Sequence, residues 1–468
     1  MLTPEKSGML RTFLGALPEN VALRLAKAIE VDRLAGGEAL PHALILEALR
    51  PALRHSHSID RTPTPLRIFC QPFADLLQSA PRKEKRKGRI ARDSVVPVWD
   101  WLSNTLMPEA VRDYAVAMRK ATATRDRDTI KAAAVPFWSL AATEMHKALA
   151  FDRKAVRTAI GSDAAADDAQ EMALLLAAGE EMTELQDTLP RGTPLLTEDL
   201  TWKLRGIYDR VVQRVPDAAA YIAVAAMNRL EKPWEALKLP LQVSRQTSDT
   251  LISNTDMGLA GEVLLGDLEI HSNAIRPTRH PIFDPVELSK HVYEFARLST
   301  GLVQEVELRR DGPWHQRLMK DRNAVADTME TLMERAPKEI VAGFPVHKTG
   351  SYGGGPKSPD ISKAPDADKT DRCLRYAKLV VGCRSSAAGA SFGAAQKDAY
   401  TEACAFLKSY SDDIVRELRT AEGPKRQNAE QYFNIAADLT AILFSAQEAE
   451  VYRRRGRAAL GDSSPAAA

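Results

Sequence analysis

The sequence predicts an all-α protein, built as a multi-helix array of helical hairpins that ends in a long antiparallel helix pair. Three observations support this prediction. Apolar residues recur at three- and four-residue steps through most of the chain, which is the period of an α-helix. Helix start and stop signals separate these stretches. No alternating apolar and polar pattern flanks an Asn-Gly or Asp-Gly turn, the pattern that most strongly indicates a β-hairpin. No repeat has a fixed period, so both a solenoid-like stack and an irregular bundle stay open.

The composition is that of an ordinary soluble protein, with 44% hydrophobic and 27% charged residues. The formal net charge of +2 creates no overall field toward nucleic acid or membranes, so such binding would need a local patch. The chain begins without a signal-peptide pattern and has no apolar run long enough for a membrane span. We therefore expect a cytoplasmic protein that does not bind membranes.

The four cysteines form no C-x-x-C pair and no zinc-type spacing with histidine. We expect them to be reduced and mostly buried as small apolar residues. No motif in the sequence requires a cofactor. The cysteines are Cys70, Cys373, Cys383 and Cys404.

The N-terminal region, 1–80, is predicted to be a small helical domain. Thr3, Pro4 and Glu5 form a helix start signal, because they offer a capping hydroxyl, a proline at the first position and an acid near the positive helix end. Two glycines at 36–37 end the helix that carries Leu25.

A basic linker, 81–93, follows and contains the sharpest charge feature of the chain. We consider it a phosphate-binding arm for nucleic acid, a solvated linker, or a segment that docks on an acidic partner surface. No aromatic residue in it offers a stacking platform for bases. The acidic stretch 163–199 provides a docking surface in the same chain or in a second copy. The candidate contact residues are Arg82, Lys83, Lys85, Arg86, Lys87, Arg89 and Arg92.

The stretch 199–239 is predicted to lie at the centre of the central helical domain, 94–342. Its first half carries one apolar stripe, which includes Leu204 and Val211. Pro216 ends this helix and favours the first turn of a new one. The run 218–227 is apolar nearly all round. A short helix of that kind is expected to be buried between neighbouring helices.

Carboxylates and histidines are dense at 267–315. Glu287, His291 and Glu294 line one strip of a predicted helix, where they are candidate ligands for a transition metal. Further candidates in this stretch are Asp267, His271 and His315. The strip flanks the apolar face of its helix, so a row of solvent-exposed ion pairs explains it as well. His146 is interpreted as a packing or surface residue.

A Gly- and Pro-rich segment, 343–370, is predicted to be a flexible linker or lid. Pro356 interrupts the spacing that a phosphate-binding loop would need between its last glycine and Lys357. The region 371–460 is predicted to form the C-terminal helical hairpin, with a stop and restart at Gly423-Pro424. The residues 461–468 are expected to be a disordered tail.

The function predicted from these features is that of a helical protein-interaction, scaffold or regulatory protein without catalytic chemistry of its own. Protein partners are expected, and the C-terminal helices offer a surface for homo-oligomers. Two alternatives are a metal-dependent enzyme with a His/carboxylate site in 267–315, and a nucleic-acid binder that uses the basic arm at 82–92.

Overall fold

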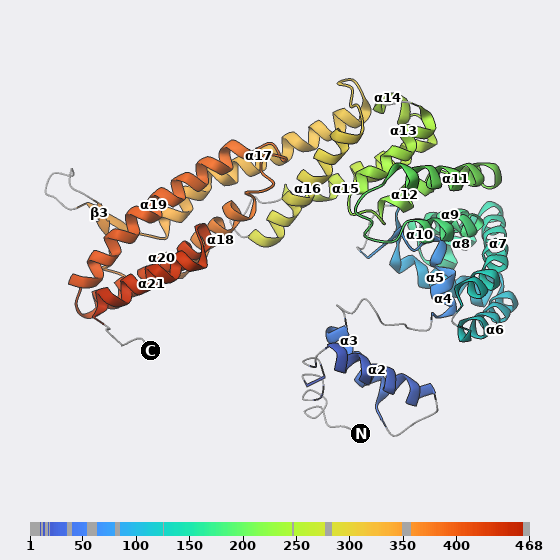
Figure 1. Ribbon diagram of the computed structural model, residues 1–468, viewed down its shortest axis with the longest axis horizontal. Coiled ribbons are helices and arrows are strands. Elements are labelled where there is room, and N and C mark those ends of the chain that lie inside the picture. The colour runs from blue at the N-terminus through green and yellow to red at the C-terminus, as the bar shows by residue number, and fades with distance from the viewer. Residues whose placement is uncertain are drawn as a thin grey trace.

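The structure is a computed structural model, and it describes residues 10, 13–14, 17, 19–34, 40–53, 63–79, 85–124, 126–245, 248–276, 283–348 and 357–461. The predicted all-α class is confirmed (Figure 1). The Thr3-Pro4-Glu5 start signal lies outside the described residues, and so do Arg82 and Lys83.

The described α-helices follow one another through the whole chain. In the first half they are α2 (Glu19–Leu34), α3 (His42–Leu53), α4 (Pro65–Phe69), α5 (Val95–Trp101), α6 (Pro108–Ala123), α7 (Arg127–Phe151), α8 (Arg153–Ile160), α9 (Asp163–Ala177), α10 (Gly179–Thr188) and α11 (Glu198–Arg214). In the second half they are α12 (Tyr221–Met227), α13 (Lys238–Ser244), α14 (Asp249–Ile252), α15 (Leu259–Ile275), α16 (Pro285–Glu305), α17 (Pro313–Ala342), α18 (Ala367–Gly382), α19 (Gly393–Thr420), α20 (Gly423–Leu443) and α21 (Ala446–Leu460).

Short helical turns join several of these helices. The 3₁₀ turns are η1 (Gln71–Phe73), η2 (Arg92–Ser94), η4 (Pro216–Ala218), η5 (Pro233–Leu237) and η6 (Asp256–Gly258), and η3 (Leu102–Leu106) is a π-helical turn. None of the described helices is both long enough and apolar enough to cross a lipid bilayer.

In the described part of the chain, two pairs of very short strands accompany the helices. β1 (Leu77–Gln78) pairs in parallel with β2 (Ile90–Ala91), with Leu77 opposite Ile90. This pairing places residues that precede the basic linker beside residues near its end. β3 (Val346–Lys348) pairs antiparallel with β4 (Lys357–Pro359). This antiparallel pair lies within the segment 343–370, which was predicted to be a flexible linker or lid.

The predicted central helix is confirmed. Every residue of α12 is buried, and its first and last side chains, Tyr221 and Met227, are each 1% exposed. Neighbours surround it: η5, α15, α10 and α11 all contact it. A helix that is apolar on all sides is stable only in such a place.

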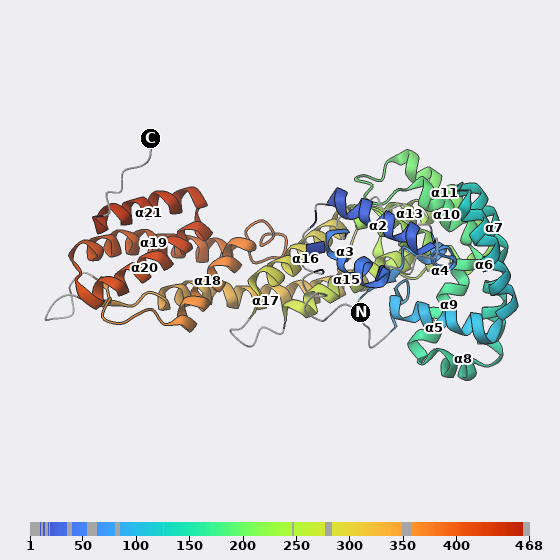
Figure 2. The same ribbon diagram turned by 90° about the horizontal axis from the view of Figure 1, so that it is seen from below.

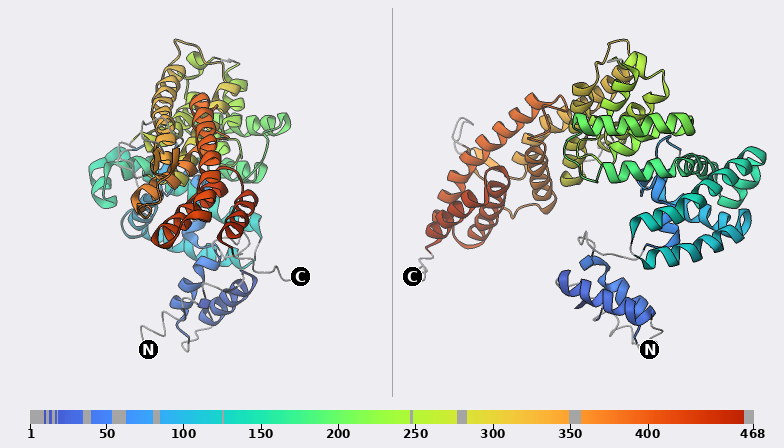
Figure 3. Two further views of the ribbon diagram at one scale, coloured as in Figure 1. Left: turned by 90° about the vertical axis from the view of Figure 1, so that its left-hand side faces the viewer. Right: turned by 45° about the vertical axis from the view of Figure 1, so that its right-hand side comes forward.

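Among the described residues, the buried apolar side chains form two clusters of very different size. The larger is continuous from Ile68 to Tyr452. The smaller joins α2 to α3 through side chains such as Ile29 and Leu49. The helices α17–α21 extend to one side of the green and cyan helices (Figures 1 and 2), and the right-hand view of Figure 3 shows the same separation. We call these five helices the arm.

The predicted last helix of the arm is divided in two. Phe444 leaves the helical conformation, with φ −114° and ψ −84°. Ser445 then caps α21 by accepting a hydrogen bond from the backbone N–H of Glu448 at 3.1 Å. The arm therefore ends in three packed helices, because α21 folds back onto α19 and α20. Two arginines inside α21 form ion pairs with the other helices of the arm: Arg453 pairs with Asp438 and Arg455 with Asp412.

The cysteines lie where apolar residues are expected. Cys373, Cys383 and Cys404 are buried, Cys70 is partly buried, and all four are free thiols. Burial raises the pKa of the Cys70, Cys373 and Cys383 thiols to about 12, so they stay protonated near neutral pH.

Candidate functional sites

The predicted metal ligands on α16 do not converge on one point. Glu287 lies 3.9 Å from Lys290, one turn along the helix. Glu294 receives two hydrogen bonds from Arg297, the shorter at 2.7 Å. Each carboxylate is thus turned toward a base on its own helix. Among the described residues, no group of three or more His, Cys, Asp or Glu side chains could hold a metal ion.

His291 meets a different partner, His271 of α15. Their Nδ1 atoms are 3.0 Å apart, and the ring centroids are 5.2 Å apart. Both side chains are half-buried at the edge of the α15–α16 contact. Burial, followed by the neighbouring His291, lowers the pKa of His271, although Glu294 and Asp267 act in the opposite direction. The neutral imidazole is therefore favoured, and its ring nitrogen keeps a lone pair.

The two remaining candidates of this region serve the fold. Asp267 forms an ion pair with Arg89. His315 takes part through its backbone N–H, which lies 3.4 Å from the Asp249 carboxylate. The structure therefore unites His291 with His271 and places Asp267 and His315 in other contacts.

The described part of the basic linker rests on acids of the same chain. Lys85 donates to Asp168 at 2.5 Å and to Glu171 at 2.6 Å, and its third hydrogen bond goes to the carbonyl of Arg89 at 2.7 Å. Both acids lie on α9, within the acidic stretch that was considered as a docking surface. The three donors of the Lys85 ammonium are thereby all used.

The two α9 carboxylates also have all their oxygens engaged. Asp168 accepts from the Ser94 hydroxyl at 2.7 Å and from the backbone N–H of Ala91 at 3.1 Å. Glu171 accepts from the Gly88 N–H at 2.8 Å and from the Tyr221 hydroxyl at 2.9 Å. Buried charges are tolerated when they are paired and hydrogen-bonded in this way.

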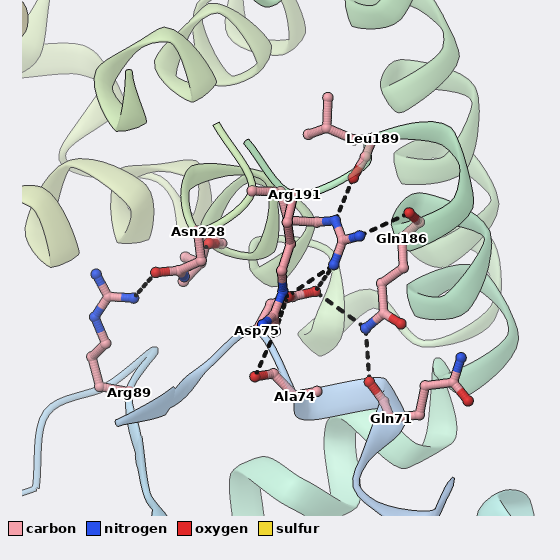
Figure 4. A network of polar contacts seen from close by, with 10 residues as sticks. Gln71, Ala74, Asp75, Arg89, Gln186, Leu189, Arg191 and Asn228 are labelled. Carbon is pink, nitrogen blue, oxygen red and sulfur yellow. Dashed lines mark hydrogen bonds and ion pairs between the residues drawn. The ribbon is translucent and has the colours of Figure 1, made fainter. Parts of the chain in front are cut away.

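The next basic residues bind across to α12 and α15. Arg86 donates to the carbonyl of Gly266 at 2.6 Å. Arg89 donates to the Asn228 side chain at 2.8 Å (Figure 4) and pairs with Asp267. Lys87 and Arg92 are exposed. We call the stretch 85–89 the clamp, because it joins α9 to α15, two helices that are about ninety residues apart in the chain.

Sequence reasoning missed a second buried ionic centre, at Asp75. Its side chain is fully buried. Arg229 contacts both of its oxygens, at 2.9 and 3.0 Å, while Arg191 and Gln186 bind at 2.9 and 3.1 Å (Figure 4). Nothing in the local sequence distinguishes Asp75 from a surface acid, since its partners come from positions more than a hundred residues away.

A cavity of about 430 Å³ lies beside the clamp. The buried Glu171 and Tyr221 and the partly buried Lys85 line it together with His146 and Asp256. His146 is exposed at its edge, in keeping with its interpretation as a surface residue. The hydrogen bonds of the clamp already occupy Lys85 and Glu171, so we assign these two lining residues to stabilising the fold.

A groove of about 400 Å³ lies on the arm, where α19, α20 and α21 meet. Its apolar lining includes Leu407, Phe444 and Val451, and Val451 is 55% exposed. The Lys408 ammonium lies 5.5 Å from the centre of the Phe444 ring. Further lining residues are Ser411, Asp412, Thr440, Glu448, Tyr452 and Arg455.

The rim of this groove carries both signs of charge. Lys408 and Glu448 are exposed. Asp412 and Arg455 bind each other at 2.9 Å, and this ion pair links α19 to α21. An apolar floor with charges of both signs around it is the composition of grooves that take an amphipathic helix.

No family model, no curated protein and no solved structure matches the chain.

Proposed function

We propose that the protein is a helical interaction protein, acting as a scaffold or regulator, whose arm binds an amphipathic helix of a partner protein. The observation that carries this proposal is the groove between α19, α20 and α21. Its volume of about 400 Å³ falls within the usual range of binding pockets. Unlike the clamp, it offers apolar atoms to solvent: Val451 is more than half exposed beside the buried Tyr452.

The groove defines the chemistry of the partner. A large apolar side chain of the partner would rest on Leu407 and Val451 and remove that surface from water. A basic residue one turn away would meet Glu448, and an acidic residue would meet Lys408. Asp412 and Arg455 already neutralise each other in an ion pair. They therefore define the shape of the groove more than its charge.

The alternative of nucleic-acid binding through the basic residues at 82–92 has less support. Of its described residues, Lys85, Arg86 and Arg89 bind atoms of this chain, while Lys87 and Arg92 face solvent. Two solvent-facing charges give little of the phosphate neutralisation that drives such binding. Affinity for random DNA and RNA that falls steeply as salt is raised would favour this alternative.

The test of the arm groove is a photo-crosslinking residue placed at Val451 in the full chain, in its native cells. A matched control carries the same residue at Val116, an exposed position on α6. We expect an adduct with one protein at 451 that is not formed at 116. The partner is then identified, purified and tested for direct binding to the full chain.

Val451→Arg places a large cation in the groove and is expected to weaken that binding by roughly tenfold or more, the effect of one central contact. An adduct with a second copy of this chain would instead identify the groove as a homo-oligomer interface. Binding unchanged in Val451→Arg, or equal adducts at both positions, would contradict the proposal.

A further inference from the structure

The pair of imidazoles at the α15–α16 contact has a geometry that packing alone does not require. His271 lies near the end of α15 and His291 near the start of α16, so the two helices face each other as the arms of a hairpin. Leu268 and Val292, which are 1% and 0% exposed, hold the helices together beside the pair. The two Nδ1 atoms are thereby kept 3.0 Å apart.

This separation suits two ligands of one ion. With each nitrogen about 2.0–2.1 Å from a shared ion, a separation of 3.0 Å corresponds to an N–metal–N angle of roughly 95°. That value is close to the right angle of a square-planar or tetragonal site and lies below the tetrahedral angle. Nitrogen ligands in tetragonal geometry favour copper(II) and nickel(II), and copper(II) binds most tightly among the divalent first-row ions.

The charged groups around the pair are balanced. Asp267 is held by Arg89, and Glu294 is held by Arg297. Arg297 is itself fixed by the carbonyl of Glu231 at 2.9 Å and by the Trp234 ring, whose centre is 5.3 Å away. These two ion pairs balance the acids and bases beside the imidazoles, and a neutral imidazole is the form that binds metals.

We propose that His271 and His291 together chelate one divalent transition-metal ion, copper(II) in preference to nickel(II) and zinc(II). The described residues provide no third ligand of the usual kinds, so water or a ligand from outside the chain fills the other positions. The bound ion would join α15 to α16 next to Asp267, the end point of the clamp on α15. This proposal is independent of the one made for the arm groove.

The competing explanation is a hydrogen bond between the two rings, in which one Nδ1–H donates to the lone pair of the other. A histidine-to-asparagine substitution separates the two. The asparagine amide can occupy nearly the same place as Nδ1 and keep a hydrogen bond, whereas it is a much poorer ligand for copper(II).

The experiment titrates the untagged full-length protein with copper(II) in the presence of glycine as a competing ligand. Electron paramagnetic resonance reports the number of bound nitrogens. We expect one ion per chain with two imidazole nitrogens. His271→Asn and His291→Asn should each weaken binding by at least about tenfold, since loss of a residue that merely supports a ligand can cost that much.

His146→Asn and His315→Asn are the matched controls and should bind as the unaltered chain does. Circular dichroism and the thermal midpoint in EDTA, measured for every variant, show whether the fold is kept. Copper(II) binding that is absent, that lacks two nitrogens, or that survives unchanged in both pair variants would overturn the proposal and leave the hydrogen bond as the explanation.

Discussion

In the basic linker, the role of a charged residue depends on partners that lie far away in the sequence. Seven bases in eleven residues are visible in the sequence, and the acidic stretch that follows is visible too. Lys85 is nevertheless bound by two particular acids, Asp168 and Glu171, more than eighty residues away. The stretch 163–199 contains ten acids. Asp168 and Glu171 are buried because they lie on the inward face of α9.

Replacement of Lys85 tests the clamp. In Lys85→Ala, Asp168 and Glu171 lose their common cation and face each other in the interior. Removing one partner of a buried ion pair costs about 3–5 kcal/mol, and we expect the lower end because both acids keep hydrogen bonds from neutral groups. The matched control is Lys87→Ala, at an exposed position two residues away, with an expected effect within about 0.5 kcal/mol. Urea unfolding measures both, and equal effects would refute the clamp.

His271 and His291 show the limit of helical periodicity at the same scale. A strip at three- and four-residue steps correctly places Glu287, His291 and Glu294 along one side of α16. Periodicity cannot show which way each carboxylate turns. Both turn toward bases on their own helix, and the partner of His291 comes from α15.

At the scale of elements, close helix contacts depend on glycines that sequence periodicity does not single out. Gly301 of α16 lies under the Trp234 ring, where an added Cβ would be 2.1 Å from the nearest ring atom. This close approach allows α16 to pack against η5. Tryptophan is too large to shift within a packed core without displacing its neighbours.

Gly301→Ala is therefore expected to destabilise the protein by about 1–3 kcal/mol, the usual cost of overpacking. Gly206→Ala is the control, in the middle of α11, where the nearest atom to an added Cβ is Arg210 Nη1 at 4.0 Å. There the higher helix propensity of alanine should stabilise the protein by up to about 1 kcal/mol. The two changes in the free energy of unfolding should have opposite signs, and a neutral Gly301→Ala would contradict the packing described.

Helix boundaries in the arm also depended on more than periodicity. The apolar period continues through Phe444 and predicts one long helix. The Ser445 cap ends it, because a capped new start permits α21 to bury Tyr452 against α19. The capping serine can be recognised in the sequence. The surface of α19 that buries Tyr452, and so stabilises the turn, exists only in the folded arm.

At the scale of the whole molecule, the separation of the interior into two clusters has a consequence for stability. The cluster of α2 and α3 is small and distinct from the one that runs from Ile68 to Tyr452. So few buried side chains provide little stability by themselves. We expect amides in 19–34 and 42–53 to exchange faster than those of the larger cluster.

A chain that begins at residue 63 should accordingly keep the thermal midpoint of the full chain. Hydrogen exchange followed by mass spectrometry and a thermal scan measure the two effects. A lowered midpoint in the shortened chain, or slow exchange in α2 and α3, would show that the first helices stabilise the rest.

The sequence by itself determined the all-α class, the buried position of α12 and the apolar setting of the cysteines, because each follows from local periodicity and hydrophobicity. Only the tertiary structure decided which charges meet: Lys85 with two acids of α9, Asp75 with Arg229, and His271 with His291. The physical reason is that an ion pair or imidazole pair needs atoms within about 3 Å, and folding sets that distance between residues far apart in the chain.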